Sequence, residues 1–125
     1  MTTRELTFAQ ALNEGLKQEM RRDPRIFLMG ENVSSEGRGV TSGLMKEFGK
    51  ERVRDTPITE AAFVGTGVGA AIAGMRPVVE MMLVDFALVA MEQIRNQAAK
   101  TRYMLGGTVT VLLTFSSLYG AGTSS

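Results

Sequence analysis

Apolar residues recur every four positions in the first part of the chain, which predicts an amphipathic helix. The repeat consists of Phe8, Leu12, Leu16 and Met20. Thr7 is placed to cap this helix, and Asp23-Pro24 should end it near Arg22.

Beyond Pro24, short apolar runs alternate with helical segments. We predict strands over 26–29, 53–55, 78–82 and 109–115. Helices are predicted over 44–48, 59–73 and 86–103, with Thr59 as the cap of the second, and residues 32–43 should form a loop. This order of elements predicts an α/β fold, a parallel sheet flanked by helices.

Composition limits the classes of function. The chain of 125 residues has a net charge of +1 without a basic stripe, so nucleic acid is an unexpected partner. Its longest apolar run, 77–90, contains Glu80 and Asp85 and falls short of the roughly 18 residues that cross a bilayer, so no membrane association is expected. No cysteine is present, and the opening residues lack a signal-peptide pattern, which together favour a cytoplasmic protein.

Acidic residues follow three of the predicted strands. Glu31 comes after the first strand, Glu60 after the second and Asp85 after the third. The carboxyl ends of parallel strands share one edge of a sheet, where ligands collect, so these residues are candidates for a site. The structural alternatives are a loop charge for Glu31, a helix first-turn residue for Glu60 and an N-cap for Asp85. Because the chain has no histidine, any chemistry depends on carboxylates or on another chain.

Small residues are spaced along one face of the predicted helix 59–73: Ala61, Gly65, Gly69 and Ala73. Such a face allows close packing against another helix, and we expect this packing at a subunit interface. The same segment contains the spacing G-x-G-x-x-A from Gly65 to Ala70, which would suit a dinucleotide-binding domain. That alternative needs a strand directly before Gly65, and the residues there favour a helix.

Several blocks of the sequence occur together in one order and register. They are 55–60 (DTPITE), 67–71 (GVGAA), 74–77 (GMRP), 84–86 (VDF), 96–100 (NQAAK) and 102–107 (RYMLGG). In these blocks the chain resembles the β subunits of pyruvate, branched-chain 2-oxoacid and acetoin dehydrogenases, within the transketolase-like pyrimidine-binding domain. The resemblance runs from about Glu5 to Gly107, and residues 114–118 match the family only loosely.

The resemblance implies a thiamine diphosphate site. Glu60 would be the catalytic residue, since the family's glutamate in this block hydrogen-bonds a ring nitrogen of the aminopyrimidine. Glu31 would lie near the cofactor and be linked to Glu60 through water, while Ile58, Met82 and Phe86 would line the pyrimidine pocket. No metal ligand is expected in this chain, because the family's α subunit holds Mg²⁺ and the diphosphate.

By the same resemblance, the chain would be a subunit of an enzyme that decarboxylates a 2-oxoacid, or cleaves acetoin, and transfers the acyl group to a lipoyl carrier. Its partners would be an α subunit, a second β subunit and a lipoyl acyltransferase. Residues 1–125 would be part of the pyrimidine-binding domain. The rest of that domain and the C-terminal domain would be absent, so we expect the isolated chain to be inactive. The alternative is a binding or structural module that keeps this fold without catalysis.

Overall fold

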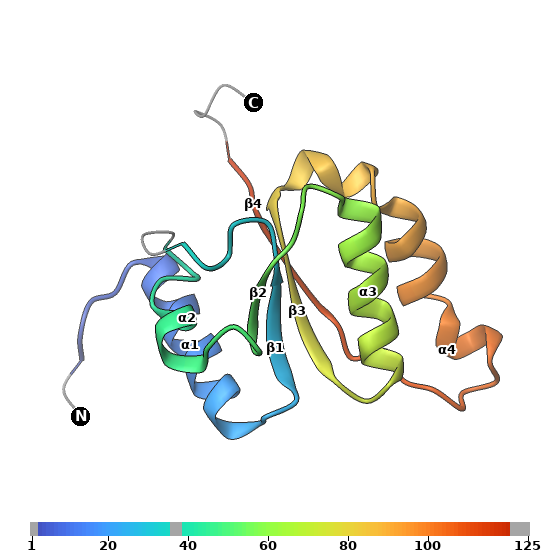
Figure 1. Cartoon of the computed structure of the whole chain (residues 1–125), viewed down its shortest axis with the longest axis horizontal. Helices are drawn as coiled ribbons and strands as arrows, with labels where there is room; N and C mark the ends of the chain where they lie inside the picture. Colours follow the sequence, from blue (N-terminus) through green and yellow to red (C-terminus); the bar gives the residue numbers. More distant parts are fainter. Residues whose placement is uncertain (1–2, 36–38, 121–125) are drawn as a thin grey trace.

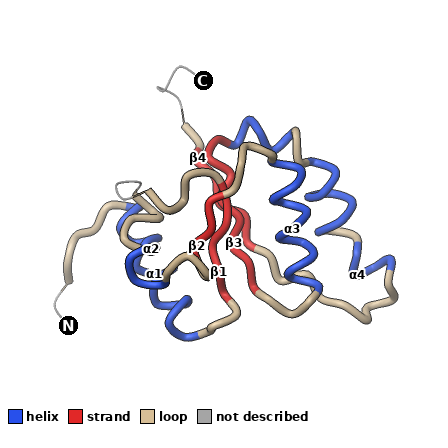
Figure 2. The backbone as a smooth tube through the Cα atoms, in the orientation of Figure 1, coloured by secondary structure: helices blue, strands red, loops and turns tan. Residues whose placement is uncertain are grey.

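The protein forms a parallel β-sheet between two layers of helices, as the sequence pattern predicts (Figure 1). The computed structural model describes residues 3–35 and 39–120. Helices α1 (Phe8–Arg22) and α2 (Leu44–Phe48) cover one face of the sheet. Helix α3 (Glu60–Ile72) and the helical segments after β3 cover the other face (Figure 2).

Four strands lie in the order β2-β1-β3-β4, and every pairing is parallel. Their bounds are β1 (Ile26–Gly30), β2 (Val53–Asp55), β3 (Arg76–Leu83) and β4 (Thr114–Leu118). The connection from β1 to β2 runs over one face, and the connection from β2 back to β3 runs over the other. The carboxyl ends of β1 and β3 therefore lie where the chain reverses its direction across the sheet, the usual place for a ligand in such folds.

Each face of the sheet has its own apolar core. On the face of α1 and α2, the buried residues are Met20, Ile26, Leu28, Val33, Leu44 and Val53. On the face of α3, they are Met29, Phe63, Val64, Val79, Met81 and Ala90. Neighbouring residues of β1 thus contribute to opposite cores, as the alternation of side chains along a strand requires.

Helix α1 has the predicted cap, but its apolar stripe is buried only in part. The Thr7 hydroxyl accepts a hydrogen bond from the Gln10 N–H at 3.2 Å, and the Gln10 side chain accepts one from the Thr7 N–H at 2.8 Å. Met20 is fully buried, whereas Phe8 is 82% exposed. Between them, Leu12 and Leu16 line a hollow of about 730 Å³ beside β3 and β4. Periodicity predicted the helix, and only the C-terminal half of the stripe enters the core.

Charged side chains hold the junction between α1 and the sheet. Asp23 accepts hydrogen bonds from the Arg25 guanidinium at 3.0 and 2.8 Å, and Arg76 Nε lies 3.4 Å from the same carboxylate. The hydrogen bonds from Arg25 hold the pKa of Asp23 well below its usual range. Arg52 donates to the carbonyl oxygens of Met20 at 2.7 Å and Asp23 at 3.0 Å, and so satisfies groups left open at the end of the helix.

The predicted helix over 86–103 is wrong as a single regular helix. The chain instead forms a 3-10 helix η1 (Val84–Leu88), a π-helix η2 (Gln93–Ala98) and a short helix α4 (Thr101–Met104). The wider π turn is visible in the hydrogen bond from the Ala99 N–H to the Ile94 carbonyl, five residues earlier, at 3.1 Å. Packing of η2 against α3 accompanies this change of hydrogen-bond pattern.

The boundaries of the last two strands also differ from the prediction. β3 begins at Arg76 because the Arg76 N–H donates to the Arg25 carbonyl at 3.0 Å, alongside β1. β4 covers Thr114–Leu118 and not 109–115, since its pairing with β3 starts at Val78 opposite Thr114. Pro77, just before Val78, has no N–H to extend that ladder.

Small residues of α3 pack within the chain. Gly67 faces the sheet, where an added Cβ would lie 2.7 Å from Val79 Cγ2, and Gly65 faces η2, where it would lie 3.3 Å from Gln93 Cγ. Gly69 meets nothing within 4 Å, and Ala73 is exposed. Part of the expected small-residue face is thus used inside the chain, and packing of the remainder at a subunit interface stays a prediction.

In the described ranges, no helix has the length and apolar character needed to span a bilayer.

Candidate functional site

The carboxyl ends of β1, β2 and β3 lie together at one edge of the sheet (Figure 1). Glu31 follows β1 directly, Glu60 opens α3 five residues after β2, and η1 follows β3. Glu31 and Glu60 are buried, with 6% and 7% of their surface exposed. Two carboxyl groups therefore lie within the protein at the edge where ligands bind in parallel sheets.

Glu60 occupies the first position of α3, where backbone N–H groups lack helical partners and the helix dipole favours a negative charge. Thr59 stands at the N-cap position as expected, but its side chain does not cap the helix. The Thr59 hydroxyl donates instead to the Pro57 carbonyl at 3.2 Å. Within the described part of the chain, no hydrogen bond or ion pair engages the Glu60 carboxylate. A buried carboxylate in this position is suited to a ligand that donates a hydrogen bond.

Gly30 and the loop after it position Glu31. A Cβ on Gly30 would lie 2.0 Å from the Glu80 carbonyl oxygen, and the φ of Gly30 is 153°, so only glycine fits between β1 and β3. Farther along the loop, the Ser34 N–H donates to Asp55 Oδ1 at 2.9 Å, and the Ser34 hydroxyl donates to Oδ2. Asp55 thus ties the loop after β1 to the end of β2.

Asp85 does not join the two buried carboxylates. It is exposed and lies inside η1, whose N-cap is Leu83, so the N-cap interpretation of Asp85 is also wrong. Among the residues that the structure describes, no group of three acidic, histidine or cysteine side chains could hold a metal ion.

The three predicted pocket-lining residues lie at the same edge with different exposure. Ile58 is 76% exposed and Phe86 is 42% exposed. Met82 is half-buried near the end of β3. Among the described residues, Ile58 and Phe86 are therefore open to solvent, while Met82 is partly covered.

One buried polar atom at this edge was not identified from the sequence. Thr56 Oγ1 is buried and makes no hydrogen bond in the described structure. The residue follows β2 directly, and its N–H donates to the Gly30 carbonyl at 2.9 Å. The signal was available only in part, because Thr56 belongs to the 55–60 block but the register of this segment against β1 is not visible in the sequence.

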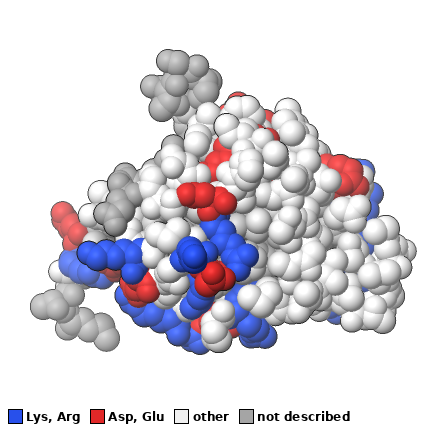
Figure 3. Space-filling model, in the orientation of Figure 1, with Lys and Arg blue, Asp and Glu red and all other residues white. Residues whose placement is uncertain are grey.

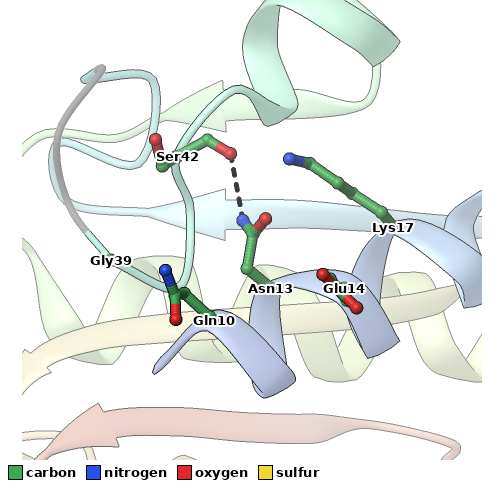
Figure 4. A pocket seen from close by; sticks show the side chains of 6 residues that line it. All are labelled: Gln10, Asn13, Glu14, Lys17, Gly39 and Ser42. Carbon is green, nitrogen blue, oxygen red and sulfur yellow. Dashed lines mark hydrogen bonds between the residues drawn. The ribbon is translucent and has the colours of Figure 1, made fainter. Parts of the chain in front are cut away.

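A polar hollow of about 330 Å³ lies away from the two carboxylates, between α1 and the segment before α2 (Figure 4). Its lining residues are Gln10, Asn13, Glu14, Lys17, Gly39 and Ser42. Asn13 donates to the carbonyl oxygens of Val40 at 2.6 Å and Ser42 at 3.0 Å. These bonds fasten the loop to α1, and we assign this hollow a structural role.

The dinucleotide alternative does not agree with the fold. Gly65 and Gly67 lie inside α3, five and seven residues after its first residue, and not in a turn between a strand and a helix. Gly67 is needed for contact with the sheet. The glycines thus serve packing.

Comparison with known proteins agrees with the architecture of this edge. The chain matches the family "Transketolase, pyrimidine binding domain" over residues 4–122. It is 47% identical over 120 residues to the mitochondrial pyruvate dehydrogenase E1 component subunit beta-1 of Arabidopsis thaliana, with 94% of this chain and 33% of that protein covered. It is 49% identical over 120 residues to the corresponding beta subunit of Rickettsia bellii, with 94% and 37% covered. The chain spans about a third of the length of these relatives.

Proposed function

Because the chain belongs to the transketolase pyrimidine-binding domain family, we propose that it forms the aminopyrimidine side of a thiamine diphosphate site in a 2-oxoacid dehydrogenase β subunit. The observation that carries this proposal is the pair of buried carboxylates, Glu31 and Glu60, at the edge of the sheet where ligands bind. The named relatives are pyruvate dehydrogenase subunits, which favours pyruvate as the substrate of the whole enzyme. Branched-chain 2-oxoacids and acetoin are the alternatives.

Each site residue has a proposed role. Glu60 accepts a hydrogen bond from the aminopyrimidine ring and exchanges a proton with its nitrogen. Glu31 supports Glu60 through water, while Ile58, Met82 and Phe86 pack against the ring and exclude solvent from it. The bound thiamine diphosphate supplies the carbon nucleophile and the base that activates it. The buried Glu60 carboxylate, which has no partner within the described chain, fits this ligand.

The proposed site needs a second chain. We assign the diphosphate and Mg²⁺ to an α subunit, as the family resemblance implies. Exposed apolar side chains, including Leu88 (76%) and Tyr103 (88%), support contact with a partner. In the view of Figure 3, charges of both signs gather over the α1 and α2 side, and the surface over α3 is largely uncharged. A second β subunit and a lipoyl acyltransferase complete the proposed assembly.

The chain is proposed to be one part of a longer protein. Residues 1–125 would form part of the pyrimidine-binding domain, and the rest of that domain and a C-terminal domain would come from further polypeptide. The proposal is supported by the coverage of the relatives, of which this chain spans 33% and 37%. Without these parts and the α subunit, the chain is expected to be inactive.

Calorimetry with thiamine diphosphate and Mg²⁺ tests the proposal. The full-length β subunit that contains this sequence should bind the cofactor in the presence of its α partner, and binding should be much weaker for either subunit alone. Cofactor binding followed by release of CO₂ from pyruvate supports the proposed enzyme function. A correctly assembled complex that binds no cofactor would instead identify the chain as a non-catalytic module.

A further inference from the structure

The Thr56 hydroxyl is a buried group without an evident structural purpose. Its Oγ1 makes no hydrogen bond in the described structure, although buried hydroxyl groups normally have a partner. A valine of nearly the same shape would fill this position without leaving a polar group unsatisfied. The presence of threonine thus suggests that the hydroxyl has a partner in the functional state.

The strand register places Thr56 beside Glu31. β1 and β2 pair in parallel with Gly30 opposite Asp55, and Glu31 and Thr56 are the residues that directly follow the two strands. The Thr56 N–H continues the ladder by donating to the Gly30 carbonyl at 2.9 Å. Glu31 and Thr56 therefore leave neighbouring strands at the same edge of the sheet, and both residues have buried polar side-chain atoms there.

We propose that Thr56 is a positioning residue: when the cofactor is bound, its hydroxyl donates a hydrogen bond to the Glu31 carboxylate and fixes the orientation of that group toward Glu60. The inference rests on the proposed function, because Glu31 and Glu60 act together only in a thiamine diphosphate site. A hydrogen bond from a hydroxyl to a carboxylate is stronger than one between two neutral groups. It also leaves the other lone pairs of the carboxylate available for water or ligand.

The test compares Thr56→Val, which removes the hydroxyl, with Thr56→Ser, which keeps it, in the full-length β subunit assembled with its α partner. Thr56→Val should weaken thiamine diphosphate binding by roughly tenfold in calorimetry, the effect of losing one hydrogen bond to a charged group. Thr56→Ser should bind nearly as the parent does. Thr66→Val is the matched control, since that exposed hydroxyl donates to the Ala62 carbonyl on α3 and lies outside the site.

Two further measurements separate positioning from a purely structural role. Without cofactor, Thr56→Val should unfold at the parent temperature or above, because no hydrogen bond is lost. With cofactor, its thermal stabilisation should be smaller than that of the parent. In a Glu31→Leu background, which removes the acceptor, Thr56→Val should cause little additional loss of affinity, since two groups that act through one contact are not additive.

The outcomes differ for the inference and for the function on which it rests. Normal cofactor binding by Thr56→Val, or an undiminished loss in the Glu31→Leu background, overturns the role of Thr56 and leaves the function intact. A lower unfolding temperature of cofactor-free Thr56→Val also overturns it, and Thr56→Ala replaces the valine variant if that fails to fold. A parent complex that does not bind thiamine diphosphate overturns both.

Discussion

Glu60 combines burial with the first position of a helix. Its carboxylate is 7% exposed, and the local backbone presents N–H groups that favour a negative charge. Position and burial together hold the group in one place before a ligand arrives. A carboxylate on a mobile surface loop would first have to be ordered, at a cost in conformational entropy.

Glu60→Gln in the assembled enzyme should lower kcat by about a hundredfold to ten-thousandfold, the range for loss of one proton-transfer group. Cofactor affinity should change much less, because the amide fills the same space. Steady-state kinetics and calorimetry measure the two effects separately. Glu51→Gln, at an exposed carboxylate near Arg54, is the control, and near-parental turnover of Glu60→Gln would remove Glu60 from the mechanism.

The sequence placed some residues of the candidate site at this edge and missed another for a physical reason. Glu31 and Glu60 were identified because each follows a strand, and the carboxyl ends of parallel strands share an edge. Asp85 satisfied the same rule but points to solvent, since the rule places a residue at the edge without fixing its direction. Thr56 was missed because its relation to Glu31 depends on the register between strands, which no local pattern contains.

Helix α3 packs on the sheet through a stripe of buried residues, in which Gly67 makes the closest approach. Gly67 rests on Val79, which is fully buried and whose branched side chain has little rotamer freedom in a packed strand. Phe63 and Val64 then complete the contact with the sheet. The position of α3 in turn sets the position of Glu60 at its N-terminus.

Gly67→Ala should destabilise the chain by about 1–3 kcal/mol, because the added methyl group overlaps Val79 in a packed core. Gly69→Ala is the matched control on the same helix, where nothing lies within 4 Å of an added Cβ. That variant should be stabilised by up to about 1 kcal/mol through the helix propensity of alanine. Urea unfolding measures both changes, and equal effects of the two substitutions would contradict this account of α3.

The elements that could be predicted are those defined by local signals. α1, β1, α2 and β2 agree with the prediction to within a residue, since periodicity, caps, glycine and proline mark their ends. The segment 84–104 could not be predicted in detail, because contact with α3, including Gln93 beside Gly65, accompanies its change from 3-10 to π turns. The start of β4 depends on its ladder with β3, a contact between distant parts of the sequence.

The stability of the whole molecule depends on a charge cluster that joins three elements. Asp23 at the end of α1 contacts Arg25 next to β1 and Arg76 at the start of β3. Because its folded pKa is lowered, the stabilisation is present at pH values above the ordinary aspartate pKa of about 3.9. It is lost as the pH falls below that value toward the folded pKa.

Urea unfolding at pH 6 and at pH 3 measures this contribution. The parent should be more stable than Asp23→Asn at pH 6, and the difference should shrink at pH 3, where the unfolded chain binds a proton that the folded chain resists. Asp85→Asn, which removes an exposed carboxylate, controls for the change in net charge. A difference between the parent and Asp23→Asn that is independent of pH would show that the contacts of Asp23 are not electrostatic.

The place of β2 in the sheet has a consequence for motion. In the described sheet, β1 has neighbours on both sides, whereas β2 is an edge strand of three residues. Edges with few contacts open with lower local free energy than the interior. Glu31 therefore follows a strand that is paired on both sides, while the segment that leads to Glu60 follows a short edge strand, where local opening is expected to need less free energy. Local opening of β2 would change the distance between the two carboxylates without unfolding the central strands. A partner subunit that covers β2 would suppress that opening.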